Sequence, residues 1–150
     1  MIVFLSCTAA KKTKRCKACE MYADSDLFSK AYKYAKKLNP DKILILSAKH
    51  HVLELDDVIE PYDLTLKDMS VDERKEWSKK VIDILKDKNI NFDQKVYFCA
   101  GEDYIEFLKD EFKNRVEVFD NKGGIGYIMQ YLDKQVSENL SDYLKKRLIF

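Results

Sequence analysis

Short apolar segments alternate with longer amphipathic segments along this chain, and this alternation limits the fold more than any other feature. The apolar segments are residues 1–6, 42–48, 95–101 and a shorter fourth at 116–119. Their odd and even positions are both apolar, as expected for strands that are covered on both faces. The amphipathic segments between them are long enough to form the crossover connections that parallel strands need. The sequence therefore predicts one three-layer α/β domain over residues 1–150, with a small, mostly parallel sheet of about four strands flanked by helices.

Helix boundaries are marked by capping residues. Asp24 or Ser25 is the expected N-cap of the first long helix, and Ser70 with Glu73 forms a capping-box pattern at the start of the second. The stretch DNKGGIG has the composition of a turn. We expect helices at about residues 25–38, 70–88, 103–113 and from 125 to the end.

Composition restricts the class of protein. The chain has 27 basic and 26 acidic residues and a net charge of +1, so no global field attracts nucleic acid. The apolar start MIVFL is short and lacks a basic n-region, and no run of about 18 apolar residues follows. We expect a cytoplasmic protein that needs no membrane partner.

The four cysteines lie in a chain without secretory features, so we expect reduced thiols. Cys16 and Cys19 form a C-x-x-C unit, but no second pair of ligands completes a zinc site. The sequence therefore predicts no metal and no cofactor, with Cys16 and Cys19 as weak metal candidates. Cys7 ends a strand and faces a lysine-rich loop, an environment that favours the reactive thiolate.

Polar or glycine residues follow each predicted strand, at the edge where ligands bind in open parallel sheets. Four separate loops thus point to one site at this edge. The glycine-rich turn offers free backbone N–H groups ahead of a helix, which suits phosphate, although it fits neither a dinucleotide fingerprint nor a P-loop. The candidates in these loops are Ser6, Cys7, Lys11, Lys12, Ser47, Lys49, His50, Gly101, Tyr104, Gly124 and Gly126.

The stretch ILILSAKHHVLELDDVIEPYDLTL places five carboxylates, a lysine and two histidines in a segment expected to be a long loop. Glu60 and Asp63 flank a Pro-Tyr turn that could fold back to Lys49, and a carboxylate near a cation can act as a general acid or base. The same three residues could instead form an ion-pair network that fastens the loop. Both interpretations stay open. We expect His51 to face solvent or to pack on the loop.

The segments SCTAAKK, CKACEMYADSDLFSKAYKYA, SAKHHVLELDDVIEPYDLTL, FCAGEDYIEFL and KGGIGYIMQYL together resemble the domain of unknown function 6884. This family consists of small bacterial, archaeal and phage proteins without an assigned reaction. The resemblance runs from the first strand to about Leu132 and is most specific in S-A-K-H and E-P-Y-D. It supports the candidates above except Lys12, includes Glu60 and Asp63, and adds Tyr22, Tyr62 and Gln130.

The order of these motifs is more distantly similar to the peroxide stress protein YaaA family. That resemblance implies DNA binding and a role in limiting iron-driven damage to DNA. The YaaA proteins are longer, however, and carry a helix-hairpin-helix insertion for which this chain has no room.

The leading hypothesis is an enzyme that acts on a nucleobase, nucleoside, nucleotide or nucleic acid, with hydrolysis of an N-glycosidic bond as the first reaction to test. Lys11, Lys12 and the glycine turn would hold phosphate, and Tyr22, Tyr62 or Tyr104 would stack on a base. The alternatives are a non-catalytic DNA- or RNA-binding protein of a YaaA-like stress response, and a thiol-based redox or sulfur-transfer protein. The catalytic candidates are Lys49, Glu60, Asp63, His50 and, for thiol chemistry, Cys7.

Overall fold

Five strands form the central sheet in the order β4-β3-β1-β6-β7. A computed structural model describes the backbone of residues 1–119 and 124–148 and the side chains of residues 1–119 and 124–137. The strands pair in parallel except at the β3–β4 edge, which confirms the predicted mostly parallel α/β sheet. Their bounds are β1 (Ile2–Ser6), β3 (Lys42–Ser47), β4 (His51–Glu54), β6 (Val96–Cys99) and β7 (Arg115–Glu117).

The fifth strand, β4, lies in the stretch that was expected to be one long loop, so that expectation was wrong. The chain leaves β3 at Ser47 and reverses within a few residues, because His51 adopts a left-handed conformation with φ of +64°. Val52 and Leu53 are then buried beside β3. Further along, β5 (Val58–Ile59) pairs antiparallel with β2 (Cys16–Lys17), so the acidic stretch is tied to the early basic loop.

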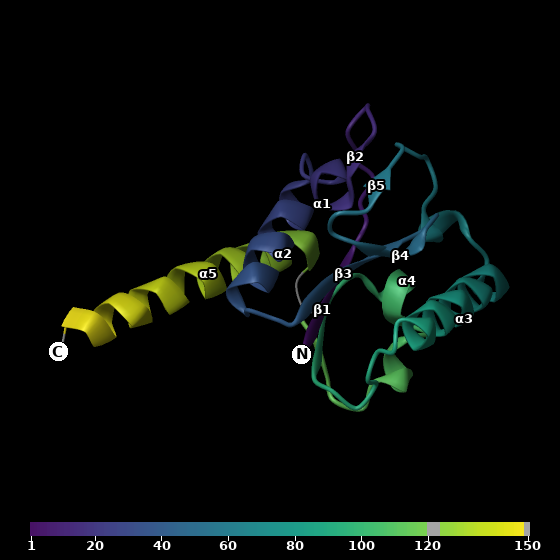
Figure 1. Cartoon of the computed structure of the whole chain (residues 1–150). Helices are drawn as coiled ribbons and strands as arrows, with labels where there is room; N and C mark the ends of the chain where they lie inside the picture. The colour runs from purple at the N-terminus through teal and green to yellow at the C-terminus, as the bar shows by residue number, and fades with distance from the viewer. Residues whose placement is uncertain (120–123, 149–150) are drawn as a thin grey trace.

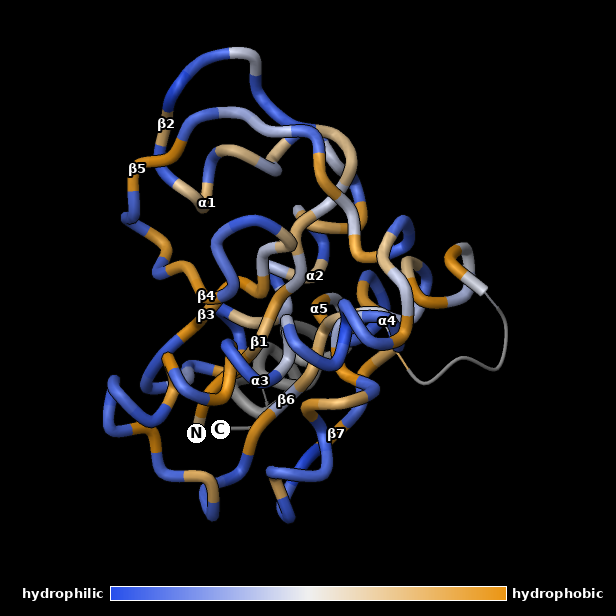
Figure 2. Tube along the Cα trace, turned by 90° about the vertical axis from the view of Figure 1, so that its right-hand side faces the viewer, coloured by the Kyte–Doolittle hydropathy of each residue, from blue (hydrophilic) through white to orange (hydrophobic). Residues whose placement is uncertain are grey.

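Helices cover both faces of the sheet (Figure 1). Figure 2 shows the same arrangement from the side, with α3 toward the viewer and α5 behind the sheet. On one face α2 packs on β1 and carries α5, and on the other α3 packs on β4 and α4 packs on α3. The bounds are α1 (Ala18–Met21), α2 (Asp26–Lys37), α3 (Val71–Asp87), α4 (Glu102–Ile105) and α5 (Gly124–Leu148), with short 3-10 turns η1 (Leu66–Asp68) and η2 (Lys109–Glu111).

The predicted capping residues begin the two long central helices. Ser25 caps α2 by accepting the amide of Phe28 at 3.2 Å, and Ser70 and Glu73 form the complete capping box of α3. The helix expected over residues 103–113 is wrong, because α4 ends at Ile105. The chain breaks there so that Phe112 can enter the core, where its ring lies 5.6 Å from those of both Phe4 and Phe98. Of the predicted turn DNKGGIG, residues 120–123 lie outside the described part.

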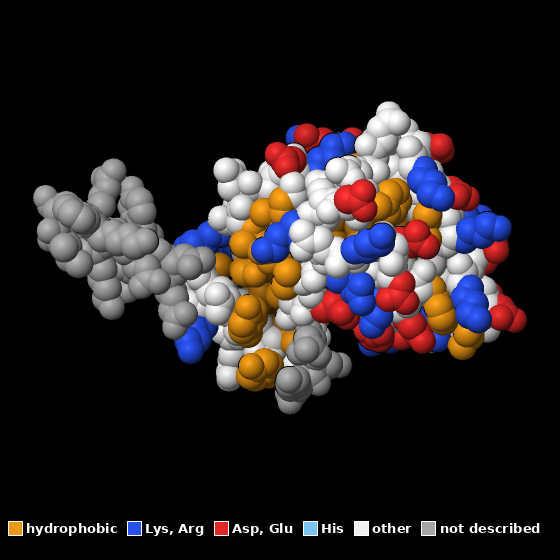
Figure 3. All heavy atoms as spheres, turned by 90° about the horizontal axis from the view of Figure 1, so that it is seen from below, with side chains coloured by type: hydrophobic (Ala, Val, Ile, Leu, Met, Phe, Trp, Pro, Cys, Tyr) orange, Lys and Arg blue, Asp and Glu red, His pale blue; other side chains and the backbone are white. Residues whose placement is uncertain are grey.

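The surface mixes charges of both signs. Figure 3 shows the face seen from below, where Lys and Arg side chains alternate with Asp and Glu and hydrophobic side chains gather in one area. No described helix is both long and apolar enough to cross a bilayer.

Candidate functional site

Five side chains from five parts of the sequence meet at the carboxyl ends of β1 and β3, and we call them the hydroxyl–thiol cluster. Its members are Cys7, Tyr22, Ser47, Tyr62 and Tyr104. The Tyr62 hydroxyl lies 2.6 Å from that of Tyr22 and 2.8 Å from that of Ser47, so three hydroxyls share two hydrogen bonds. The thiol of Cys7 lies 3.0 Å from the Tyr104 hydroxyl. The sequence named all five residues, and the fold brings them together.

Ser47 holds this cluster to the end of β3. Its hydroxyl accepts the backbone amide of His50 at 3.1 Å, and its carbonyl accepts the indole N–H of Trp77 at 3.0 Å. Trp77 also meets the Tyr104 ring edge-on at 5.8 Å, which links α3 and α4 to the cluster. Because Ser47 is fully buried, each of these bonds satisfies a group that water cannot reach.

The phenols of the cluster remain protonated at neutral pH. Burial raises the pKa of Tyr22 to about 12, and burial likewise raises the pKa of Tyr62 and of Tyr104. These groups therefore position their neighbours by hydrogen bonding and do not serve as bases. Tyr22 has no exposed surface and packs against Phe28, so its ring offers no face to a stacking base in this conformation.

A broad recess opens beside the cluster, and we call it the hollow. It has a volume of about 500 Å³ and contains charged groups of both signs above an apolar floor. Its lining consists of Arg15, Lys49, His50, Leu53, Asp57, Val58, Ile59 and Glu60. Arg15 enters the hollow because β2 pairs with β5, a contact that the sequence pattern did not indicate.

The five carboxylates of the acidic stretch divide into two groups. Glu54 pairs with Lys42 at 2.6 Å, Asp56 lies 3.7 Å from Lys17, and Asp57 accepts the amide of Glu54 at 2.8 Å, so these three stabilise the local structure. Within the described chain, Glu60 and Asp63 make no hydrogen bond or ion pair, and neither does Lys49. The ion-pair network considered for these three residues is therefore not formed. Glu60 and Lys49 face the hollow, and Asp63 is exposed outside its lining.

His50 connects the hollow to the cluster. The edge of its ring faces the Tyr62 ring at 5.5 Å, and its amide bonds to Ser47. Its Nε2 atom is buried and has no hydrogen-bond partner among the described groups. Burial, together with the charge of Lys49, lowers the pKa of His50 below its usual range. The imidazole is therefore mostly neutral at pH 7, and its Nε2 lies below the surface in this conformation.

An NMR titration tests this description of His50. We expect its imidazole to titrate below about 6.5, the usual value for histidine. Lys49→Met should raise the pKa of His50, because the ammonium of Lys49 disfavours the imidazolium. Lys80→Met is the matched control, since Lys80 lowers the pKa of His51 instead. A His50 pKa at or above 6.5, or a His50 pKa that is unchanged in Lys49→Met, would contradict the proposed environment.

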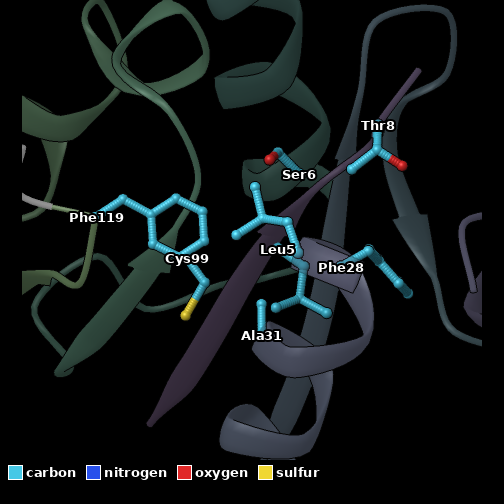
Figure 4. A pocket seen from close by; sticks show the side chains of 8 residues that line it. Leu5, Ser6, Thr8, Phe28, Ala31, Cys99 and Phe119 are labelled. Atoms are coloured by element: carbon cyan, nitrogen blue, oxygen red, sulfur yellow. The ribbon is translucent and has the colours of Figure 1, made fainter. Parts of the chain in front are cut away.

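A second recess lies at the topological switch point between β1 and β6, where α/β sheets often bind ligands. Figure 4 shows Leu5, Ser6, Cys99 and Phe119 around it, with Phe28 and Ala31 of α2. The crevice is largely apolar and has a volume of only about 10 Å³, which is room for about one water molecule. Among the described residues it brings no charged side chain into its lining, so we place the candidate chemistry at the hollow.

The remaining candidates lie around these features. The Lys11 ammonium sits 4.6 Å above the Tyr62 ring, whereas Lys12 pairs with Asp24 at 2.7 Å and is less available to phosphate. His51 was expected to face solvent or to pack on the loop, and instead it stacks on Trp77 of α3. The glycine and glutamine candidates, Gly101, Gly124, Gly126 and Gln130, are exposed and have no part in the lining of the hollow.

The cysteine pair gives no metal centre on this geometry. Cys16 lies in β2 and Cys19 in α1, both partly buried with free thiols. No group of three or more His, Cys, Asp or Glu side chains in the described part of the chain is arranged to hold a metal ion.

Comparison with known proteins gives one match. A family model described as "Family of unknown function (DUF6884)" matches residues 2–134. No curated protein and no solved structure matches the chain significantly. The more distant similarity to the YaaA family therefore stays a prediction.

Proposed function

The chain belongs to the DUF6884 family, whose function is unknown, and we propose from the site alone that it is an enzyme hydrolysing the N-glycosidic bond of a nucleotide, nucleoside or nucleic acid. The observation that supports this proposal is the set of side chains that line the hollow. Two cations, a carboxylate without a protein partner and the ring of a neutral histidine line one recess. These are the groups needed to hold a phosphate, activate a water molecule and contact a base.

Arg15 and Lys49 supply the phosphate-binding groups. Both are exposed at the hollow, and within the described residues neither forms an ion pair. An arginine binds phosphate through paired N–H groups and a lysine binds it as a point charge. A phosphate held there would fix the sugar within reach of the rest of the lining.

Glu60 is the proposed general base. It takes a proton from water as the water oxygen bonds to C1′ and the bond from C1′ to the base nitrogen breaks. The departing base gains one proton overall, so one water is consumed and Glu60 is regenerated. Its negative charge also stabilises the oxocarbenium character of the transition state. Glu60 thus takes the role for which Glu60 and Asp63 were both considered.

His50 would contact the base. Its Nε2 is buried without a hydrogen-bond partner, so contact with a base requires the ring to turn toward the hollow, and the hydrogen bond made there would satisfy this nitrogen. The cluster behind it fixes the backbone of His50 through Ser47. The apolar side chains of Leu53, Val58 and Ile59 give the base a surface, a role first expected of the tyrosines.

Two other functions were considered from the sequence. A non-catalytic binding protein would use the same cations, but it gives no reason for a carboxylate in the recess. Thiol chemistry is less favoured, because Cys7 is only 6% exposed and its thiol contacts Tyr104.

A chromatographic assay tests the proposed reaction. Purified protein is incubated with the common nucleosides, their monophosphates and oligonucleotides containing normal, modified or damaged bases, and released free base is measured. We expect release from at least one substrate, with one equivalent of the reducing sugar for each base. If no substrate yields a free base under conditions where a known glycosidase does, the proposed reaction is wrong.

A further inference from the structure

The charges around the hollow suit a small ligand better than a polymer. We infer that the substrate is a free nucleoside monophosphate and not a nucleic acid strand; this inference rests on the function proposed above. Three features of the hollow support it: the number of available cations, the carboxylates around them and the size of the recess.

The cations of the hollow match one phosphate group. Arg15 and Lys49 face the recess without a protein partner, as described above. Two neighbours in the basic segment are already engaged, because Lys12 pairs with Asp24 and Lys17 lies 3.7 Å from Asp56. The other two lysines of this segment lie outside the lining of the hollow: Lys11 sits over the Tyr62 ring and Lys14 is exposed. A nucleic acid strand would present several phosphates in a row, and its binding normally uses a series of free cations.

Carboxylates surround the same recess. Asp57 and Glu60 are in its lining, and Asp56 and Asp63 are exposed nearby in the sequence. Within a distance of about 8–10 Å, such charges are not fully screened at physiological salt. They would repel the phosphates on either side of a bound nucleotide, whereas a monophosphate has none there.

The recess also has the size of a small-molecule site. Its volume of about 500 Å³ falls inside the range of roughly 300–1,000 Å³ that is usual for small-molecule pockets. Leu53 and Ile59 form a buried apolar floor and Val58 is 51% exposed beside them. The lining thus divides into an apolar part for a base and a charged part for one phosphate.

Isothermal titration calorimetry with the wild-type chain tests this inference. The probes are the 5′-monophosphates of adenosine, guanosine, cytidine and uridine, the four matching nucleosides, and single-stranded DNA and RNA ten-mers of mixed sequence. We expect at least one monophosphate to bind with a Kd roughly 10-fold or more below that of its nucleoside, since the difference is a phosphate held by two cations. The ten-mers should bind more weakly than that monophosphate.

Two variants identify the phosphate-binding group. Arg15→Met should raise the Kd of the preferred monophosphate several-fold toward that of its nucleoside, with Lys49 still in contact with the phosphate, and leave the Kd of the nucleoside nearly unchanged. Lys33→Met removes an exposed cation from the outer face of α2 and should change neither value. Because both side chains are exposed, neither substitution is expected to affect folding.

The inference is overturned if a ten-mer binds more tightly than every monophosphate and loses affinity steeply with added salt. Equal Kd values for monophosphates and nucleosides, or no binding of any monophosphate, would overturn it as well. The base-release assay separates this outcome from failure of the proposed function. If base is released only from oligonucleotides, the monophosphate is not the substrate but the proposed reaction stands. If a monophosphate binds and releases no base, the proposed reaction is wrong but the inferred ligand stands.

Discussion

Glu60→Gln should lower the rate of base release by about 100-fold or more, because positioned acid–base catalysis typically contributes that much or more. Glutamine keeps the size and the polarity of the side chain but cannot take a proton from water. Substrate binding should persist, since Arg15 and Lys49 are unchanged. The measurement is steady-state release of free base on the best substrate, and we expect the loss in kcat with KM changed little.

Glu76→Gln is the matched control for that variant. Glu76 is an exposed glutamate on α3, outside the lining of the hollow. It should retain wild-type kcat and KM. A Glu60→Gln enzyme that keeps wild-type kcat would remove the carboxylate from the mechanism, even if the protein proved to be a glycosidase.

The second large effect is expected for Ser47→Ala, which should lower the free energy of unfolding. The substitution leaves the part-buried amide of His50 without its acceptor and removes one of the two bonds of the Tyr62 hydroxyl. Each buried polar group left without a partner costs about 1–3 kcal/mol. We therefore expect the free energy of unfolding to fall by about 2 kcal/mol, and Tm by roughly 4–8 °C for a chain of this length.

The second buried serine provides the control. Ser78 lies in α3 with 2% of its surface exposed, and its hydroxyl takes no part in the hydrogen bonds of the cluster. Urea denaturation of both alanine variants should show a loss for Ser78→Ala of less than half that for Ser47→Ala. Equal losses would mean that the cluster adds nothing beyond the burial of a small polar residue.

The strands and long helices could be predicted because local rules determine them. Buried apolar runs mark β1, β3 and β6, and the serines at positions 25 and 70 cap α2 and α3 through bonds to residues close in sequence. The strand β4 was missed, since it depends on the left-handed conformation of His51, a residue type that gives little sign of it. The end of α4 was missed because the core position of Phe112 is set by Phe4 and Phe98, far away in the chain.

The sequence predicted which residues lie at the site better than it predicted what each residue does there. The carboxyl ends of parallel strands lie at one edge of a sheet, so Cys7, Ser47 and Tyr104 could be placed at the same edge from the sequence. Burial decides what each side chain can do, and sequence does not give burial at single positions. Tyr22 was expected to stack on a ligand and instead lies in the core. Arg15 was missed as a site residue because only the pairing of β2 with β5 brings it to the hollow.

The most direct test of the account is to find where a nucleotide binds. The measurement is an NMR titration of the isotopically labelled protein with the 5′-monophosphates, following backbone amides and the His50 imidazole. We predict chemical-shift changes that saturate together at Arg15, Lys49, His50 and Glu60, with the change at Nε2 of His50 among the largest changes. Shifts confined to the crevice around Leu5, Cys99 and Phe119, or no shifts at the hollow at saturating nucleotide, would contradict it.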